Sequence, residues 1–292
     1  MYHNFSELLS CCEGENKALW QVILENEREL SGKSEEEIYA EIKKRYRVML
    51  DAGQKAIVKE KADAGSLIGG NAFRHNAYAE KTGGICGSFI NRVMARALAG
   101  SEANASMGRI CAAPTAGSCG ILPSVVISLA EERGLNEKDI LNALLTASGV
   151  GAIVIRNGSV AGAEGGCQLE CGVASAMAAA AAVEMMGGTP AAALQSFSIA
   201  LVNIMGLICD PVAGLVQIPC AQRNASGAVN ALLSADLALG GMVLPIPPDE
   251  VLDAMMRVGK MLPIQLKETS LGGIAATPSG KRIKKELFGV SH

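Results

Sequence analysis

The stretch from Gly151 to Pro248 constrains the fold more than any other part of the chain, because it contains very few charged side chains. Only seven occur: Arg156, Glu164, Glu170, Glu184, Asp210, Arg223 and Asp236. A segment this poor in charge is expected inside the molecule. Its most regular part, GVASAMAAAAAVE (172–184), combines high helix propensity with side chains small enough for neighbouring helices to pack closely. We therefore expect a buried helix at the centre of the fold.

The composition is that of a globular protein and argues against a nucleic-acid partner. Hydrophobic residues make up 49% of the 292 residues and charged residues 19%. The net charge of −3 and the aromatic content of 3% provide neither a basic surface nor many platforms for stacking bases. The first residues, MYHNFSELLSCCEGENK, lack a basic segment followed by an apolar one, so we predict a cytoplasmic protein. In that compartment its nine cysteines are not expected to form a disulfide framework.

One segment is long and apolar enough to raise the question of a membrane helix. Residues 185–209 carry no charge and match the length that spans a bilayer. However, Pro190, Gln195 and Asn203 interrupt this segment, and neither flank has a Lys or Arg. A helix buried on all sides in a globular protein has the same hydropathy. We favour the buried helix and expect no membrane partner.

Local capping signals predict where several helices begin. Ser34 and Glu37 form a capping box that opens a charged helix running towards Lys61. Thr189-Pro190 supplies a cap and a proline at the first helical position. Other predicted helices cover residues 137–146 after the cap Asn136, residues 224–239 and residues 249–262.

Alternating patterns typical of strands are scarce, and GAIVI (151–155) is the best candidate for a short one. We predict an all-α (mainly helical) fold, in which Gly-rich loops between buried central helices form the functional site. The charge distribution divides the chain into a charged N-terminal helical segment (1–64) and a helical domain (65–292) that carries the site.

Several common kinds of site are missing from the sequence. It has no G-x-x-x-x-G-K-[ST] and no G-x-G-x-x-G after a strand, so nucleotide binding is unsupported. Of the three histidines, His3 and His292 are near the ends, and His75 has no G-x-S-x-G serine to serve. No C-x-x-C occurs, which excludes the usual zinc-finger spacing.

Cysteines on loops are the remaining chemical signal. Cys209 and Cys220 flank a loop broken by two prolines, and Cys167 lies in a Gly-rich loop. Thiolates that converge from loops are typical ligands of iron–sulfur clusters. The long gaps between these cysteines predict no geometry, so a cluster and an ordinary core role both stay open on spacing alone.

Four long motifs resemble the α subunit of the iron–sulfur-dependent bacterial L-serine dehydratases. They are APTAGSCGILP (113–123), GAEGGCQLECGVASAMAAA (162–180), CDPVAGLVQIPCAQRN (209–224) and LGGIAATPSGK (271–281). The resemblance covers the chain from about Ser66 onward. It implies that Cys167, Cys209 and Cys220 hold a [4Fe–4S] cluster. Three cysteines leave one of the four irons without a protein sulfur, and such an open iron site can act as a Lewis acid. Whether a monovalent cation such as K⁺ is also required stays open.

The resemblance implies elimination of water from L-serine, which gives pyruvate and ammonia without pyridoxal phosphate. Asp210 and Arg223, beside the cluster cysteines, are expected to orient the ligands, with a plain buried ion pair as the alternative. Glu164 and Glu170 are expected to cap or brace their loop, with proton transfer as the other reading. The predicted substrate-binding residues are Ser66, Gly69, Gly70, Asn71, Asn104, Ser106, Arg109, Thr115 and Ser118.

The general base is not apparent in this chain. In the family a Ser-Ser-His-Thr segment in the β region is its suspected source, and no such segment occurs here. The resemblance therefore implies a heterodimer in which a separate β subunit completes the active site, and the charged N-terminal helices are candidates for that contact. His75 is the candidate catalytic base within this chain.

Three other functions are compatible with parts of the sequence. A related cluster-dependent lyase, such as an L-cysteine desulfidase, would release sulfide instead of water. A redox or regulatory cluster subunit would have no chemistry of its own. A helical membrane subunit is the third alternative.

Overall fold

The computed structural model describes residues 1–58, 60 and 66–289, and its regular structure is helical throughout. Short turns lie between the α-helices, among them η1 (Ala116–Ser118), η3 (Val212–Gly214), η5 (Gly273–Ala276) and the π-helical turn η2 (Gln168–Gly172). No strand forms within these residues, so the predicted all-α fold is confirmed. The α-helices are α1 (Phe5–Glu15), α2 (Leu19–Ser31), α3 (Glu35–Val58), α4 (Asn71–Thr82), α5 (Gly87–Ala105), α6 (Ile121–Arg133), α7 (Glu137–Asn157), α8 (Gly162–Gly165), α9 (Val173–Met185), α10 (Pro190–Ile204), α11 (Cys220–Leu239), α12 (Pro248–Met261) and α13 (Pro278–Phe288).

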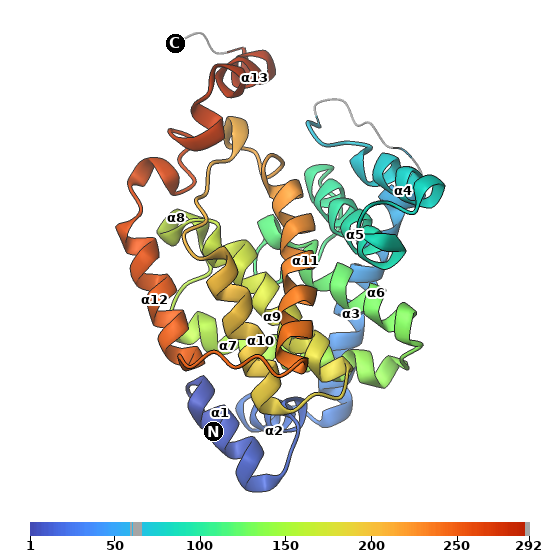
Figure 1. Cartoon of the computed structure of the whole chain (residues 1–292), viewed down its shortest axis with the longest axis vertical. Helices are drawn as coiled ribbons and strands as arrows, with labels where there is room; N and C mark the ends of the chain where they lie inside the picture. Colours follow the sequence, from blue (N-terminus) through green and yellow to red (C-terminus); the bar gives the residue numbers. More distant parts are fainter. Residues whose placement is uncertain (59, 61–65, 290–292) are drawn as a thin grey trace.

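The Ala-rich helix α9 lies at the centre of the fold, as the sequence predicts (Figure 1). It packs against α6, α7, α10 and α11, and Glu184 is its only residue that is not fully buried. Small side chains allow the close approach: Ser175 donates a hydrogen bond to the carbonyl of Gly227 on α11. A Cβ added at Gly227 would lie 3.1 Å from the Ser175 Oγ. The central helices therefore pack nearly backbone to backbone.

The N-terminal helices cover one end of this core, and α13 lies at the opposite end (Figure 1). Asp249, in the first turn of α12, accepts hydrogen bonds from the backbone N–H groups of Phe5 (2.9 Å) and Ser6 (3.0 Å), which begin α1. The Phe5 ring packs on Phe197 of α10 with 4.5 Å between ring centroids. Helix α3 packs against α5, and α2 against α7. The division of the chain at residue 64 stays a prediction.

Most of the predicted helix starts are confirmed by hydrogen bonds. Ser34 N–H donates to Glu37 Oε2 (2.8 Å) and Glu37 N–H donates to Ser34 Oγ (3.3 Å), which is the predicted capping box. Asn136 and Thr189 accept from the amides of Asp139 and Ala192 at the starts of α7 and α10. The helix after Ser34 ends at Val58, and Lys61 lies outside the described residues.

Two sequence predictions are corrected by α7 and α11. GAIVI (151–155) is not a strand but part of α7, which continues well beyond the predicted end at residue 146. A run of five apolar residues cannot distinguish a strand from a buried helix, and the surrounding helices decide the outcome. Helix α11 begins at Cys220 rather than at residue 224, and α12 covers Pro248–Met261.

By length and composition, one described helix, α7, could cross a membrane, but 72% of its apolar window is buried inside the fold. The uncharged residues 185–209 do not form one continuous helix. They contain the end of α9, a turn, α10 and a loop. Most of the middle of α10 is buried, whereas the turn before α10 and residues 202–208 are partly or fully exposed, so the predicted helix buried on all sides is confirmed only in part.

Candidate metal centre

Three buried cysteines come from three separate segments of the chain. Cys167 directly precedes the π-helical turn η2, Cys209 lies in the loop after α10, and Cys220 is the first residue of α11. Their exposed fractions are 2%, 4% and 8%, respectively. The backbone of Cys209 is fixed from both sides, because its N–H donates to Leu266 O and its carbonyl accepts from Glu268 N–H, both at 2.8 Å. The position of the Cys209 thiol is therefore fixed by backbone hydrogen bonds on both sides of the residue.

The side chains of two of these cysteines lie close to a carboxylate. The ligand atoms of Cys167, Glu170 and Cys209 all lie within 4.8 Å of one another. Cys209 Sγ is 3.8 Å from Glu170 Oε2, and Cys167 Sγ is 3.4 Å from the thiol of Cys171. No disulfide joins any of the nine cysteines.

The charges around Cys167 favour its thiolate form. Hydrogen bonds from the Cys171 and Cys209 thiols hold the pKa of Cys167 well below its ordinary value, and the Arg223 guanidinium acts in the same direction. The pKa values of Cys171 and Cys209 are raised, first because they donate to this thiolate and then because they are buried. Burial, followed by the charge on Cys167, raises the pKa of Cys220 to about 12. The surroundings thus favour a negative charge on the sulfur of Cys167.

Asp210 and Arg223 form an ion pair of 2.7 Å beside this group, with side chains 2% and 16% exposed. Arg223 also donates to the carbonyl of Ile208 (2.9 Å), and Asp210 Oδ2 accepts from the amide of Ile274 (2.8 Å). A Cβ at Gly273, whose φ is +56°, would lie 2.1 Å from Asp210 Oδ2. The pair therefore ties the Cys209 loop to α11 and to η5.

Glu170, which is expected from the sequence to cap or brace its loop, lies beside the thiols of Cys167 and Cys209. Its position is set by Thr115, whose hydroxyl donates to Glu170 Oε1 at 2.8 Å. Burial, and next the charge on Cys167, raises the pKa of Glu170 to about 7. A Cβ at Gly162 would lie 2.5 Å from Glu170 Oε2 and 3.1 Å from Cys209 Sγ, which explains the glycine there. No sequence signal distinguishes Glu170 from Glu164, since both lie three residues from Cys167.

The predicted substrate-binding residues lie in two places, and the first is close to Glu170. Thr115 contacts Glu170 directly, and the buried Ser118 Oγ lies 3.2 Å from the Thr115 hydroxyl. Ser66 precedes Leu67, whose N–H donates to Gln217 Oε1 (2.7 Å), so this loop adjoins the segment that leads to Cys220.

Two backbone amides in the segment SLIGGNA (66–72) have a hydrogen-bond acceptor within the chain. Gly70 N–H donates to Glu102 Oε2 (3.2 Å) and Ala72 N–H to Glu102 Oε1 (2.7 Å), which caps the start of α4. Asn71 Oδ1 accepts from Arg74 (2.9 Å), and the carbonyl of Asn104 accepts from Met107 N–H (3.0 Å). Substrate binding by Gly70, Asn71 and Asn104 stays a prediction.

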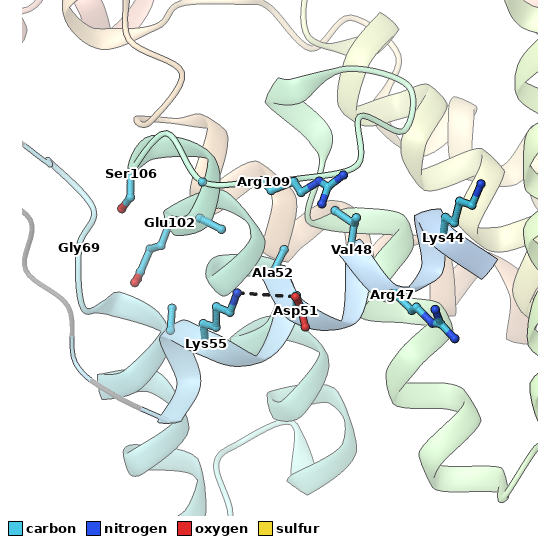
Figure 2. Close-up of a pocket in the computed structure, with 13 residues that line it drawn as sticks. Lys44, Arg47, Val48, Asp51, Ala52, Lys55, Gly69, Glu102, Ser106 and Arg109 are labelled. Atoms are coloured by element: carbon cyan, nitrogen blue, oxygen red, sulfur yellow. Dashed lines mark ion pairs between the residues drawn. The ribbon is translucent and has the colours of Figure 1, made fainter. Parts of the chain in front are cut away.

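The second place is a groove of about 620 Å³ between α3 and the loop after α5 (Figure 2). Gly69, Ser106 and Arg109 line it together with Arg47 and with Lys55 and Asp51, which form an ion pair (3.7 Å). None of the described residues that line this groove is a cysteine. Three of the predicted substrate residues therefore share a site that the thiols do not line.

The histidines do not join the thiols in any described contact. His75 lies on α4, with its ring 6.3 Å from that of Tyr78, and its buried Nε2 has no hydrogen-bond partner among the described residues. His3 Nδ1 lies 3.0 Å from Arg156. His292 lies outside the described residues. Glu164 is exposed on α8.

The donor set fits a soft metal centre. Sulfur ligands select iron–sulfur clusters and other soft ions, and a thiolate is the form that binds them. Cys167 and Cys209, with Glu170, form a group of ligand atoms that suits such a centre, and the Asp210–Arg223 pair lies beside it. Cys220 is buried but does not belong to this group, so its predicted role as a third cysteine ligand stays a prediction.

Comparison with known proteins identifies relatives over nearly the whole chain. Residues 14–275 match the family described as "Serine dehydratase alpha chain". The chain is 42% identical over 289 residues to the probable L-serine dehydratase, alpha chain, of Bacillus subtilis, covering 99% of this chain and 96% of that one. It is 43% identical over 288 residues to the L-serine dehydratase, alpha chain, of Peptoniphilus asaccharolyticus, covering 99% of both.

A longer relative shows that the same region also occurs within a larger protein. The chain is 37% identical over 280 residues to the L-serine dehydratase TdcG of Escherichia coli. The match covers 94% of this chain but only 61% of that relative. The rest of that relative lies outside the match.

Proposed function

Because this chain belongs to the serine dehydratase alpha-chain family, we propose that it is the α subunit of an L-serine dehydratase. The reaction removes the α-proton and the hydroxyl of L-serine, and the resulting enamine hydrolyses to pyruvate and ammonia. The observation that carries the proposal is the meeting of Cys167, Cys209 and Glu170 in one buried site, from segments about forty residues apart.

We assign the metal centre to Cys167, Cys209 and Cys220. A [4Fe–4S] cluster held by three thiolates would supply a Lewis-acidic iron for the serine hydroxyl. The protein provides the rest: Asp210 fixes Arg223, and Arg223 stabilises the anionic sulfur of Cys167. Thr115 and Ser118 adjoin this site and are the candidates for orienting the substrate.

The proton acceptor is expected from a separate β subunit. The name "alpha chain" of the relatives supports a two-chain enzyme, as does the longer relative that contains this region as 61% of its length. His75 is the candidate base within this chain, and its Nε2 has no partner among the described residues. A cytoplasmic location and a requirement for K⁺ stay predictions.

The proposal is tested by purifying the chain anaerobically with its candidate β subunit and measuring iron, sulfide and pyruvate. We expect about four irons per α chain, as for a single [4Fe–4S] cluster, and loss of activity in air. Cys209→Ser should abolish both iron binding and pyruvate formation, whereas Cys86→Ser, at an exposed cysteine, should change neither. Full, stable activity of an iron-free preparation would exclude the proposed mechanism. Parallel assays of sulfide release from L-cysteine would identify a desulfidase.

A further inference from the structure

Glu170 occupies an unusual position for a carboxylate. It lies among buried thiols, in the same turn as Cys171, and its Oε2 is 3.8 Å from Cys209 Sγ. Glu170 is partly buried, and a carboxylate withdrawn from water normally gains a cation or several N–H donors, because its desolvation is otherwise costly. Among the described residues, the Thr115 hydroxyl donates to Glu170, and the Cys209 thiol is the other polar group in contact with it. The nearby cation Arg223 is paired with Asp210.

The two carboxylate oxygens have different surroundings. Oε1 is held by Thr115 at 2.8 Å, which fixes the orientation of the group. Oε2 faces the sulfurs, and it belongs to the set of ligand atoms that lie within 4.8 Å of one another. A residue that only braced its loop would direct both oxygens to backbone N–H groups, as Glu102 does at the start of α4. The arrangement is instead that of a metal ligand held by a neighbouring hydroxyl.

We propose that Glu170 is the fourth protein ligand of the metal centre, through a carboxylate oxygen, alongside Cys167, Cys209 and Cys220. This inference rests on the proposed function, since it assumes that the cysteines hold the cluster. A carboxylate carries the same charge as a fourth thiolate, so the total ligand charge would equal that of a four-cysteine cluster. Its oxygen is a harder ligand than sulfur and suits iron in such a cluster less well. The site could therefore exchange this ligand for substrate.

The test compares the reconstituted holoenzyme carrying Glu170→Gln with wild type and with Glu164→Gln. Glu164 is a matched control because it lies on the neighbouring α8 and its side chain is exposed. The iron without a cysteine ligand, here called the unique iron, is labelled with ⁵⁷Fe and examined by Mössbauer spectroscopy in the absence of substrate. Mild oxidation with ferricyanide then removes this iron, and the rate of its loss is measured from the growth of the EPR signal of the three-iron cluster.

We expect Glu170→Gln to shift the Mössbauer parameters of the unique iron and to accelerate its loss about tenfold, by analogy with other residues that support metal sites. Glu164→Gln should behave as wild type. If Glu170→Gln does not fold, Glu170→Asp keeps a carboxylate with a shorter reach, and a shift confined to the unique iron is then expected.

Two failures are distinguishable. A variant with a full cluster and an unchanged unique iron overturns the role of Glu170 but leaves the proposed function intact. A wild-type enzyme that makes pyruvate without any cluster overturns the proposed function itself.

Discussion

Replacing Asp210 by alanine should destabilise the chain far more than replacing an exposed partner of an ion pair. Asp210 is 2% exposed, and its two oxygens accept from Arg223 at 2.7 Å and from the amide of Ile274 at 2.8 Å. Removing one partner of a buried ion pair costs about 3–5 kcal/mol, because the other charge stays buried. Arg223 keeps its bond to Ile208 and the Cys167 thiolate nearby, so we expect a loss of about 2–4 kcal/mol.

The assay is urea unfolding of the metal-free chain under reducing conditions, monitored by circular dichroism. Asp51→Ala is the control, because the Asp51–Lys55 pair is more than 70% exposed on both sides and 3.7 Å long. Such exposed pairs contribute about 0–1 kcal/mol. The double variant Asp210→Ala, Arg223→Met should recover part of the loss, since it removes both charges together. A free energy of unfolding for Asp210→Ala within 1 kcal/mol of Asp51→Ala (on the scale of an exposed pair) would refute this reasoning.

Two further predictions concern the packing of the helical core. Burial raises the pKa of Glu184, which accepts from the Thr146 hydroxyl at 2.9 Å, so its contribution to stability is present at low pH and is lost as the pH rises through its folded-state pKa. Glu184→Gln should therefore be more stable than wild type at neutral pH but not at low pH, and equal pH profiles of the two unfolding midpoints would contradict this. Gly120→Ala would place a Cβ 2.3 Å from the backbone oxygen of Ala97, where α5 and α6 meet, and should cost about 1–3 kcal/mol. Gly134→Ala, at a C-cap with φ +62° and open space around it, tests backbone strain alone, and a Gly120→Ala loss no larger than that of Gly134→Ala would argue against the steric explanation.

The parts of the fold that were predicted correctly are those with local causes. Ser34, Asn136 and Thr189 begin helices because each side chain reaches an amide three residues ahead, so the signal is contained in four residues. The Ala-rich helix α9 could be predicted because almost all of its side chains are small and apolar, so they can be buried without hydrogen-bond partners. The failed strand at residues 151–155 had no such local cause, since the same apolar run fits a helix once α9 covers it.

Glu170 could not be found in this way, because its role depends on residues far apart in the sequence. Thr115 orients it from 55 positions away, and Cys209 lies 39 positions on. Nothing local distinguishes it from Glu164 on the same loop. The difference arises where the chain winds into the π-helical turn η2, a feature that is rare and frequent at functional sites.

The few charged residues in the central part of the sequence also indicate where the functional site lies, in addition to the fold class. Of the seven charged side chains between residues 151 and 248, Arg156, Glu164 and Asp236 are exposed. Of the other four, Asp210 is buried and Glu170, Glu184 and Arg223 are partly buried, so the ionised form of each needs a compensating partner. Glu184 has Thr146, and the remaining three, Glu170, Asp210 and Arg223, all surround the thiols. Asp210 and Arg223 compensate each other, whereas the described neighbours of the partly buried Glu170, a hydroxyl and thiols, carry no positive charge. A metal ion or cluster is the group that would complete its surroundings.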